Sequence, residues 1–483
     1  MKKETLQFIL LLFVFILTRV LVLSSSGSVN WNAEECYIGT IANEIAHGTK
    51  LQWYEMPFAE YQLGGVIDAY LSSLFYTNNF LEPYAIKILP LLYATVCFIL
   101  FYIITHKFYS RFIAVTSAIL FIFSSNLFIR WNLINGSGDF LSLTMYTLII
   151  FYVFLKISKG KDSTKWWVLL GLFLGFGFVV NYACLLMLPI VLGYLLANRK
   201  SFLPFTSSFF LGTLPFWVFQ LFYNNIKEIY LIYAFSNLSL THFIFKLKSI
   251  LFKEFIRSFH SNFYVINYAY FYLFIISFVI CLIILMKPMK KNFFQTIQYN
   301  LNLIVPIIFI LLFFIIYSLT KFGDYQRRAA TESSNAFYYL VTYPFFFILI
   351  STSGSILLAS KGRISRILGV TIIIVSVLLG IISLSELINQ DELFSVQYQP
   401  YCYKGAIDLC GKHCGETPKY FSSPGQIFFF RYYNQKNLLP KTYLFQLCKK
   451  MSTQEHQEEC TEVVRYYFNK VNMTLPHNFT QFS

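Results

Sequence analysis

Two adjacent carboxylates, Glu34 and Glu35, come just after the first long apolar run of the chain, in the stretch NWNAEECYIGTIANEIAHG. Glu34 falls on an apolar helical stripe whose other members are Ile38, Ile41 and Ile45. An apolar wall raises the pKa of a carboxylate, which suits it to accept a proton as a general base. Glu35 stands three residues after an asparagine, the spacing of a helix capping box, so a structural role for Glu35 competes with a chemical one.

A third acid, Asp139, follows a glycine-containing turn in RWNLINGSGDFLSL. The turn lets the chain double back, so Asp139 stands where one apolar segment has ended and the next begins. Asp is a common helix N-cap, and that role is compatible with a place beside the acidic pair at the rim of a membrane. Charged groups at such places usually mark functional sites, because an unpaired charge there is costly.

The composition identifies the environment in which these acids act. Of the 483 residues, 57% are hydrophobic, 20% aromatic and only 13% charged, and the mean hydropathy is +0.57. A water-exposed globular surface cannot carry so few charges, so the chain is predicted to cross a membrane many times. The net charge of +15 comes largely from loops that face anionic lipid head groups, and it does not indicate nucleic-acid binding.

Hydrocarbon offers no partner to backbone polar groups, so each crossing must be a helix of roughly 20 residues. The first apolar run, from Leu6, follows two lysines and precedes no small-residue cleavage site, so we expect a retained anchor helix. The run 166–197 is too long for one crossing and has Asn181 at its centre, which predicts two short helices joined by a turn. The predicted fold class is an α-helical polytopic membrane protein with about 11 transmembrane helices. The later ten are expected near 86–106, 112–130, 140–157, 166–180, 182–197, 203–222, 263–286, 301–319, 337–359 and 364–386.

Loop charges predict the orientation, because cytoplasmic loops collect Lys and Arg. With the N-terminus inside, strict alternation places every short basic loop on the cytoplasmic side. Treating 166–197 as one crossing would move two basic loops outside, so the charges support the split. The outer side then receives the loops 24–83, 131–139 and 223–262, the segment 320–336 and the tail 387–483.

The polar tail predicts a second domain. Residues 389–483 are expected to form a small mixed α/β domain outside the membrane, after a transmembrane domain of residues 1–388. Three cysteines, Cys97, Cys184 and Cys281, fall inside predicted crossings and are expected to pack there. Six fall on the outer side, where disulfides can form with fifteen possible connectivities, and a zinc site at 410–414 is the alternative. These six are Cys36, Cys402, Cys410, Cys414, Cys448 and Cys460.

Two further patterns have structural interpretations. Residues 241–260 interleave apolar and basic side chains at near-helical spacing, which predicts a helix lying in the membrane interface. Gly171, Gly175 and Gly177 in GLFLGFGF lie inside a predicted crossing, where small residues at this spacing serve helix packing. The chain thus shows no pattern of a soluble nucleotide-sugar site, and a lipid-linked donor fits that absence.

The order of these features resembles the GT-C superfamily of membrane glycosyltransferases, specifically the protein O-mannosyltransferases and the lipid A aminoarabinose transferase, as in glycosyltransferase family 39. Those enzymes have an acidic pair directly after the first helix, which AEECYIGTIANEIAHGTKLQWYEMPFAEYQLGG matches here. The resemblance continues to an Asp at the start of the fourth helix, matched by Asp139, and to the late span NAFYYLVTYPFFFILI. The pair is Glu-Glu where the family often has Asp-Glu, and the Arg expected before the late Tyr is replaced, leaving Tyr338 and Tyr339.

The resemblance implies a reaction and roles for the three acids. A polyprenyl-phosphate-linked sugar would lie with its lipid in the bilayer, and the enzyme would transfer its hexosyl or pentosyl group to a glycan, lipid or protein acceptor at the outer face. Glu34 would be the base that takes the acceptor proton. Glu35 and Asp139 would orient the acceptor or hold a divalent cation that neutralises the leaving phosphate.

Cationic side chains must also meet the phosphate of such a donor. Arg327 and Arg328 stand about ten residues before the late span, and Lys87 stands near the outer end of the second helix. Because these residues stand near the matched segments, the resemblance implies that they bind the donor phosphate through charge-assisted hydrogen bonds.

Two other functions stay open from the sequence. A transporter or lipid flippase of envelope glycan precursors would use Glu34 and Asp139 as proton or substrate sites, although the chain has no internal repeat and its acids gather at one face, which favours an enzyme. A noncatalytic assembly factor would bind a partner through its tail. The low charge and the short glycosylation sequons favour a bacterial inner membrane, with the active site and C-terminus facing the periplasm, over the endoplasmic reticulum.

Overall fold

The computed structural model describes residues 3–25, 38, 42, 45–46, 64–76, 85–134, 140–160, 163–197, 201–223, 239–257, 259, 264–286, 293–320 and 336–389. The chain divides into two compact units. The first comprises Met1–Val29, Pro90–Leu133 and Gly138–Glu392, and the second comprises Asn30–Leu89, Ile134–Ser137 and Leu393–Ser483. The predicted α/β domain of residues 389–483 lies beyond the described residues except for Asn389, so that domain stays a prediction.

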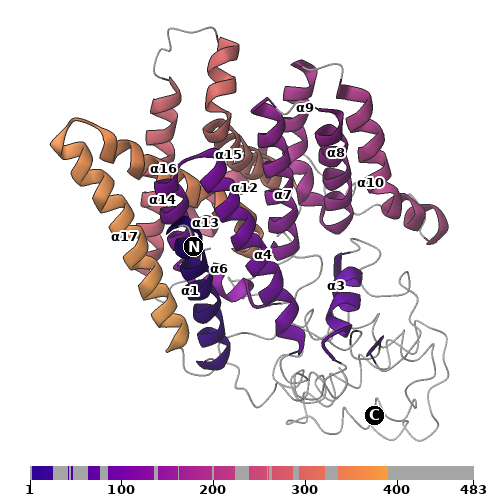
Figure 1. Cartoon of the computed structure of the whole chain (residues 1–483), viewed down its shortest axis with the longest axis horizontal. Coiled ribbons are helices and arrows are strands. Elements are labelled where there is room, and N and C mark those ends of the chain that lie inside the picture. Colours follow the sequence, from indigo (N-terminus) through magenta and orange to yellow (C-terminus); the bar gives the residue numbers. More distant parts are fainter. Residues whose placement is uncertain are drawn as a thin grey trace, which may run out of the picture. The chain divides into compact units, whose positions relative to one another are not determined.

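Helices make up the described part of the chain, which contains no strand (Figure 1). The shorter ones include two 3-10 helices, η3 and η8, and one π-helix, η6. In chain order the elements are α1 (Lys3–Ser25), α3 (Gly64–Ser73), α4 (Ala85–Phe108), α5 (Arg111–Ile122), α6 (Asn126–Trp131), α7 (Phe140–Ser158), α8 (Thr164–Val180), η3 (Tyr182–Met187), α9 (Leu188–Ala197), α10 (Phe202–Tyr223), α12 (Leu240–Ser249), η6 (Ile250–Glu254), α13 (Phe255–Arg257), α14 (Tyr264–Met286), α15 (Phe293–Leu319), η8 (Ala336–Thr342), α16 (Tyr343–Ala359) and α17 (Arg363–Ile388).

Eleven apolar segments among the described residues correspond to the predicted crossings. Six are long and apolar enough to cross a membrane, and five more are apolar helices of 10–17 residues. The agreement is close for the late span, predicted at 337–359 and found as η8 and α16 between Ala336 and Ala359. The number of crossings itself stays a prediction, because the shorter helices do not span a bilayer by length alone.

The break predicted at Asn181 is confirmed. Asn181 has an extended backbone, with φ −154° and ψ 125°, so α8 ends at Val180. Its side-chain oxygen accepts a hydrogen bond from the backbone N–H of Ala183 at 2.9 Å and thereby caps η3. A short polar side chain that competes with the helix backbone explains why one apolar run forms two elements.

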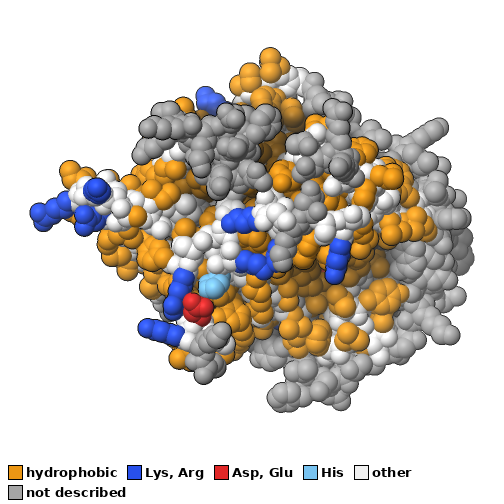
Figure 2. Space-filling view, turned by 45° about the horizontal axis from the view of Figure 1, so that its top comes forward, with side chains coloured by type: hydrophobic (Ala, Val, Ile, Leu, Met, Phe, Trp, Pro, Cys, Tyr) orange, Lys and Arg blue, Asp and Glu red, His pale blue; other side chains and the backbone are white. Residues whose placement is uncertain are grey.

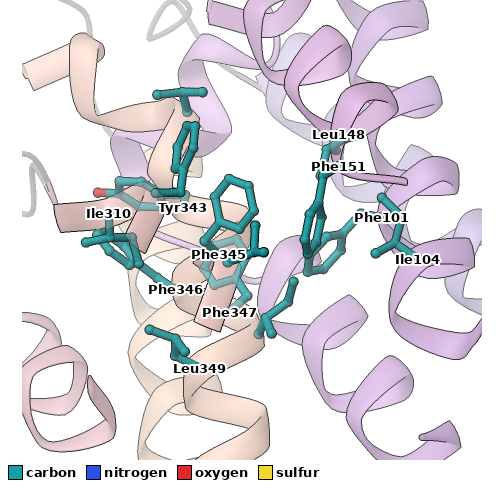
Figure 3. Close-up of a cluster of buried hydrophobic side chains, with 14 of the residues drawn as sticks. Phe101, Ile104, Leu148, Phe151, Ile310, Tyr343, Phe345, Phe346, Phe347 and Leu349 are labelled. Carbon is teal, nitrogen blue, oxygen red and sulfur yellow. The ribbon is translucent and has the colours of Figure 1, made fainter. Parts of the chain in front are cut away.

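One large apolar core holds the first unit together, and α16 lies at its centre. Phe345 of α16 contacts Phe151 of α7, and Phe347 of α16 contacts Phe101 of α4 (Figure 3). Phe346, on another side of α16, contacts Phe255 and Phe274. In the most apolar window of the span Tyr339–Ala359, which contains α16, 83% of the residues are buried, against 22% in the span of α1. A helix that is apolar on all sides belongs in the interior, whereas α1 leaves most of its apolar surface for lipid.

The glycines of GLFLGFGF serve helix packing, as predicted. A Cβ at Gly171 would lie 2.3 Å from the Phe205 carbonyl oxygen, and one at Gly175 would lie 2.3 Å from the Phe209 carbonyl oxygen. On the facing helix, a Cβ at Gly212 would lie 2.6 Å from a carbonyl oxygen of α8. Helices α8 and α10 therefore touch backbone to backbone, which requires glycine at these positions.

The segment predicted to be an interface helix is helical over α12, η6 and α13. Its apolar side chains do not share one environment: Phe245 is 60% exposed, whereas Phe255 is fully buried. Lys246 is buried as well, and its ammonium group donates a hydrogen bond to the Thr320 carbonyl at the end of α15. The location of this helix in a membrane interface stays a prediction.

Candidate functional site

Most of the predicted site residues lie outside the described residues. These are the three acids and the two arginines, namely Glu34, Glu35, Asp139, Arg327 and Arg328. The six cysteines predicted on the outer side also lie outside them, whereas Cys97, Cys184 and Cys281 are buried and form no disulfide, which agrees with their predicted packing role. Lys87 lies within the described residues. So do Ile38 and Ala42, which follow Glu34, and α7, which follows Asp139.

The helical stripe that follows Glu34 is buried where the structure describes it. Ile38 is 1% exposed, and Ala42, one helical turn further, is fully buried. Ala42 and Tyr76 form a small cluster with Ala46 and Phe75, so this segment packs against the chain just after α3. Glu34 precedes Ile38 by four residues, and a continuous helix would place it on the same buried face.

Lys87 is only 2% exposed and lies in the first turn of α4. A helix N-terminus carries a partial positive charge and unsatisfied N–H groups, so it favours anions. A lysine buried there adds a full positive charge to the same place. Lys87 has interaction partners.

Asp68 of α3 is buried as well and also has interaction partners. The sequence analysis did not select Asp68 as a site residue, although an acid inside the apolar string VIDAYL is an unusual feature.

Helix α7 begins at Phe140, the residue after Asp139, which confirms the helix start predicted there. The preceding element is α6, whose N-cap Ser125 accepts a hydrogen bond from the backbone N–H of Phe128 at 3.4 Å. The Phe128 ring stacks on Tyr343 of α16 with centroids 5.3 Å apart. These contacts attach α6, the element that precedes Asp139 in the chain, to the central helix of the core.

A cavity of about 10 Å³, room for about one water molecule, lies among α4, α5, α6, α7 and η8. Its lining includes Asn132, whose side-chain oxygen is buried without a hydrogen-bond partner, and Thr144 in the second turn of α7. The other lining residues are Cys97, Phe121, Phe128, Trp131 and Leu340. A cavity of this size is far too small to hold a lipid-linked sugar.

Arg19 links α1, the helix before the acidic pair, to α5. It is fully buried in α1, and its guanidinium donates to the carbonyls of Phe121 at 3.1 Å and Ile122 at 2.9 Å. Those carbonyls belong to the last residues of α5, and the partial negative charge of a helix C-terminus stabilises a nearby cation. The guanidinium also lies 4.6 Å from the centroid of the Phe15 ring, a cation–π contact.

Sequence reasoning missed Arg19 and also Arg130, a buried residue of α6. The sequence did contain an indication of the buried role of Arg19, because this one arginine interrupts the apolar string FILTRVLVL. A charge inside a predicted crossing usually has a specific partner. The partner itself, more than 100 residues away in the chain, gave no local signal.

Comparison with known proteins gives a family match over part of the chain and a fold. A family model described as dolichyl-phosphate-mannose-protein mannosyltransferase matches residues 69–223, which include Lys87 and Asp139. An apo structure of the oligosaccharyltransferase from Archaeoglobus fulgidus superposes with a TM-score of 0.52 at 13% identity, covering 89% of this chain and 60% of that one. A second structure, the archaeal oligosaccharyltransferase AglB from the same organism with an inhibitory peptide and a dolichol-phosphate, superposes with a TM-score of 0.46 at 12% identity, covering 88% and 59%. The search of curated proteins found no match.

The family match over residues 69–223 and the shared fold agree with the GT-C resemblance found in the sequence. The chain is accordingly a multi-pass membrane protein. It spans about 60% of the length of the archaeal enzyme whose fold it shares.

Proposed function

We propose that the protein transfers a glycosyl group, hexosyl or pentosyl, from a polyprenyl-phosphate-linked sugar to an acceptor at the outer face of the membrane. The match of residues 69–223 to a family that uses dolichyl-phosphate-mannose is the observation that carries this proposal. The acceptor is a glycan, a lipid or a protein, and the face is the one that also receives the C-terminal domain. In a bacterium that face is the periplasmic side of the inner membrane.

Glu34 is the proposed base. Its supporting observation is the burial of Ile38 and Ala42, which continue the helical face of Glu34 into an apolar contact. An apolar surrounding disfavours the charged form of a carboxylate and so raises its pKa toward the working pH, where a base is most effective. The base would take the proton from the acceptor hydroxyl or amine as that group attacks the sugar.

Glu35 and Asp139 are proposed to orient the acceptor or to hold a divalent cation. Carboxylate oxygens are the ligands that magnesium, manganese and calcium prefer, so the residue types fit such an ion. The start of α7 at Phe140 supports a fixed position for the backbone next to Asp139. When bound, the cation would supply charge neutralisation for the leaving phosphate.

Lys87 is proposed to bind the donor phosphate, together with Arg327 and Arg328. The support for Lys87 is its position: a buried ammonium in the first turn of α4 adds to the positive potential of a helix N-terminus. The two arginines stand in the segment between α15 and η8, and their support is the basic sequence alone.

The test is the transfer of labelled sugar by the purified full chain from a panel of polyprenyl-phosphate sugars. Glu34→Gln and Asp139→Asn are compared with Glu44→Gln, which removes an acid from the same segment with no proposed role, and folding is checked for each. We expect Glu34→Gln to lose at least 10²-fold in rate, the usual contribution of a positioned base, with Glu44→Gln near wild type.

If wild type transfers sugar and Glu34→Gln transfers it at the same rate, Glu34 is not the base. A protein that moves lipid-linked sugar across a vesicle membrane without transferring it would support the alternative function, a flippase of glycan precursors. The same vesicles, assayed for access of the labelled sugar to an external oxidant, separate these two outcomes.

A further inference from the structure

Figure 2 shows Lys and Arg side chains on the surface of the described residues, where water or lipid head groups can meet them directly. A polar atom inside the molecule must instead find its partner in the interior. Asn132 has such an atom: the residue is 1% exposed, and no group among the described residues donates a hydrogen bond to its Oδ1. Asn132 also lines the cavity of about 10 Å³ among α4, α5, α6, α7 and η8. A buried acceptor therefore lies beside an internal space.

The rest of Asn132 is fixed by the end of α6. Asn132 is the C-cap of that helix, and its backbone N–H donates to the Phe128 carbonyl at 3.2 Å. Its side-chain Nδ2 donates to the same carbonyl. A carbonyl oxygen requires a donor, so this hydrogen bond decides which end of the amide is the nitrogen. Oδ1 is left as an acceptor, and an acceptor buried without a donor loses its hydration without compensation.

The size and the lining of the cavity select its occupant. A volume of about 10 Å³ is close to the least that a water molecule needs. Only two of the lining side chains, those of Asn132 and Thr144, contain an oxygen. Calcium or magnesium takes about six or more oxygen ligands, so two oxygens are too few for such an ion. An apolar occupant would leave Oδ1 without a donor, whereas water supplies one.

Thr144 provides the second partner for a water molecule. It lies in the second turn of α7 and is 3% exposed. Thr144 already has an interaction partner. Its hydroxyl has one donor and two acceptor lone pairs, so it can accept a hydrogen bond from water in addition. Water has two O–H groups, one for each of the two oxygens.

We propose that this cavity binds one ordered water molecule, which donates to Asn132 Oδ1 and to Thr144 Oγ1. Asn132 ends α6 and Thr144 belongs to α7, so the two residues flank the connection 133–139, which contains Asp139. The water links the two ends of that connection. Asn132 and Thr144 are thereby positioning residues for Asp139, and this last role rests on the proposed function, whereas the water site itself does not.

The direct test is cryo-electron microscopy of the full chain in nanodiscs, at a resolution that shows other buried waters. We expect a density peak at about 2.7–2.8 Å from both Asn132 Oδ1 and Thr144 Oγ1. The peak should persist in Thr147→Val, which removes a buried hydroxyl of α7 that does not line the cavity. It should be lost in Asn132→Leu. A wild-type map that shows other buried waters but no peak here overturns the proposal.

A double-mutant cycle tests the bridge by a second route, reversible unfolding in mixed micelles. Thr144→Val keeps the shape of the side chain and removes the hydroxyl. Asn132→Leu also removes the hydrogen bond to the Phe128 carbonyl, but the cycle cancels that contribution. The unfolding equilibrium constant of the double variant should be about threefold to fivefold smaller than independent effects predict. Independent effects overturn the bridge, and Asn132→Leu with Thr147→Val, the control cycle, should show independent effects.

Sugar transfer tests the positioning role separately. We expect Thr144→Val to lower kcat at least about tenfold with the KM for the donor unchanged, and Thr147→Val to keep both values near wild type. An unchanged kcat for Thr144→Val beside a loss in Asp139→Asn overturns the positioning role. Wild-type transfer by Asp139→Asn removes Asp139 from the proposed function and the positioning role with it, while the density peak still decides whether the water is bound.

Discussion

Replacing Arg19 by methionine is expected to lower the free energy of unfolding by about 3 kcal/mol. The guanidinium makes hydrogen bonds of 2.9 Å and 3.1 Å to the last carbonyls of α5, and the side chain is fully buried. A hydrogen bond from a charged group contributes about 1.5–3 kcal/mol, and two give about 3–6 kcal/mol. Interhelical side-chain hydrogen bonds in membrane proteins average only about 0.6 kcal/mol, which gives about 1 kcal/mol for two. The expected value lies between these limits, because methionine would leave two buried carbonyls without any donor.

Arg111 provides a matched control on the same pair of helices. It joins the other end of α5 to α1, donating to the Gln7 side-chain oxygen at 2.8 Å and 3.0 Å and lying 3.9 Å from a Glu4 carboxylate oxygen. Its side chain is 44% exposed, so water and salt screen these contacts. Arg111→Met should therefore cost no more than about 1 kcal/mol.

The assay is reversible unfolding by sodium dodecyl sulfate in mixed micelles, followed by helix content, with sugar transfer measured in parallel. Arg19→Lys keeps the charge and one donor direction, so it should fall between wild type and Arg19→Met. We also expect Arg19→Met to lose transfer activity while still folded, because Arg19 joins α1, which precedes Glu34, to α5, which is followed by α6 and then by Asp139. Equal midpoints for Arg19→Met and Arg111→Met would refute this account of the two helices.

Three further predictions follow from single contacts. Gly175→Ala should cost about 1–3 kcal/mol or more, since its Cβ would meet the Phe209 carbonyl at 2.3 Å, whereas Gly193→Ala, with open space around it, should be neutral or slightly stabilising in the same unfolding assay. Lys246→Met should loosen α12 from the end of α15, which faster amide exchange over residues 240–257 would show, with unchanged exchange arguing against the contact. Removal of divalent cations by a chelator should abolish sugar transfer and magnesium or manganese should restore it; activity that survives chelation leaves Glu35 and Asp139 with an orienting role only.

The helices of this protein were largely predictable because each one satisfies its backbone within its own segment. Lipid offers no hydrogen bonds, so a run of apolar residues of sufficient length has few alternatives to a helix. The break at Asn181 was predictable for the same local reason, a polar side chain in the middle of a long apolar run. The helix packing role of Gly175 followed from spacing alone and was confirmed by its contact with α10.

The amino-acid sequence by itself determined the membrane class, the helical segments and the resemblance to GT-C glycosyltransferases, since composition and local order carry that information. The partners of the buried charges were decided only by the tertiary structure. Arg19 meets carbonyls more than 100 residues away, and Lys246 meets the Thr320 carbonyl 74 residues away. Such pairs depend on which faces of the packed helices meet, and the periodicity of one segment does not indicate which other segment it will contact.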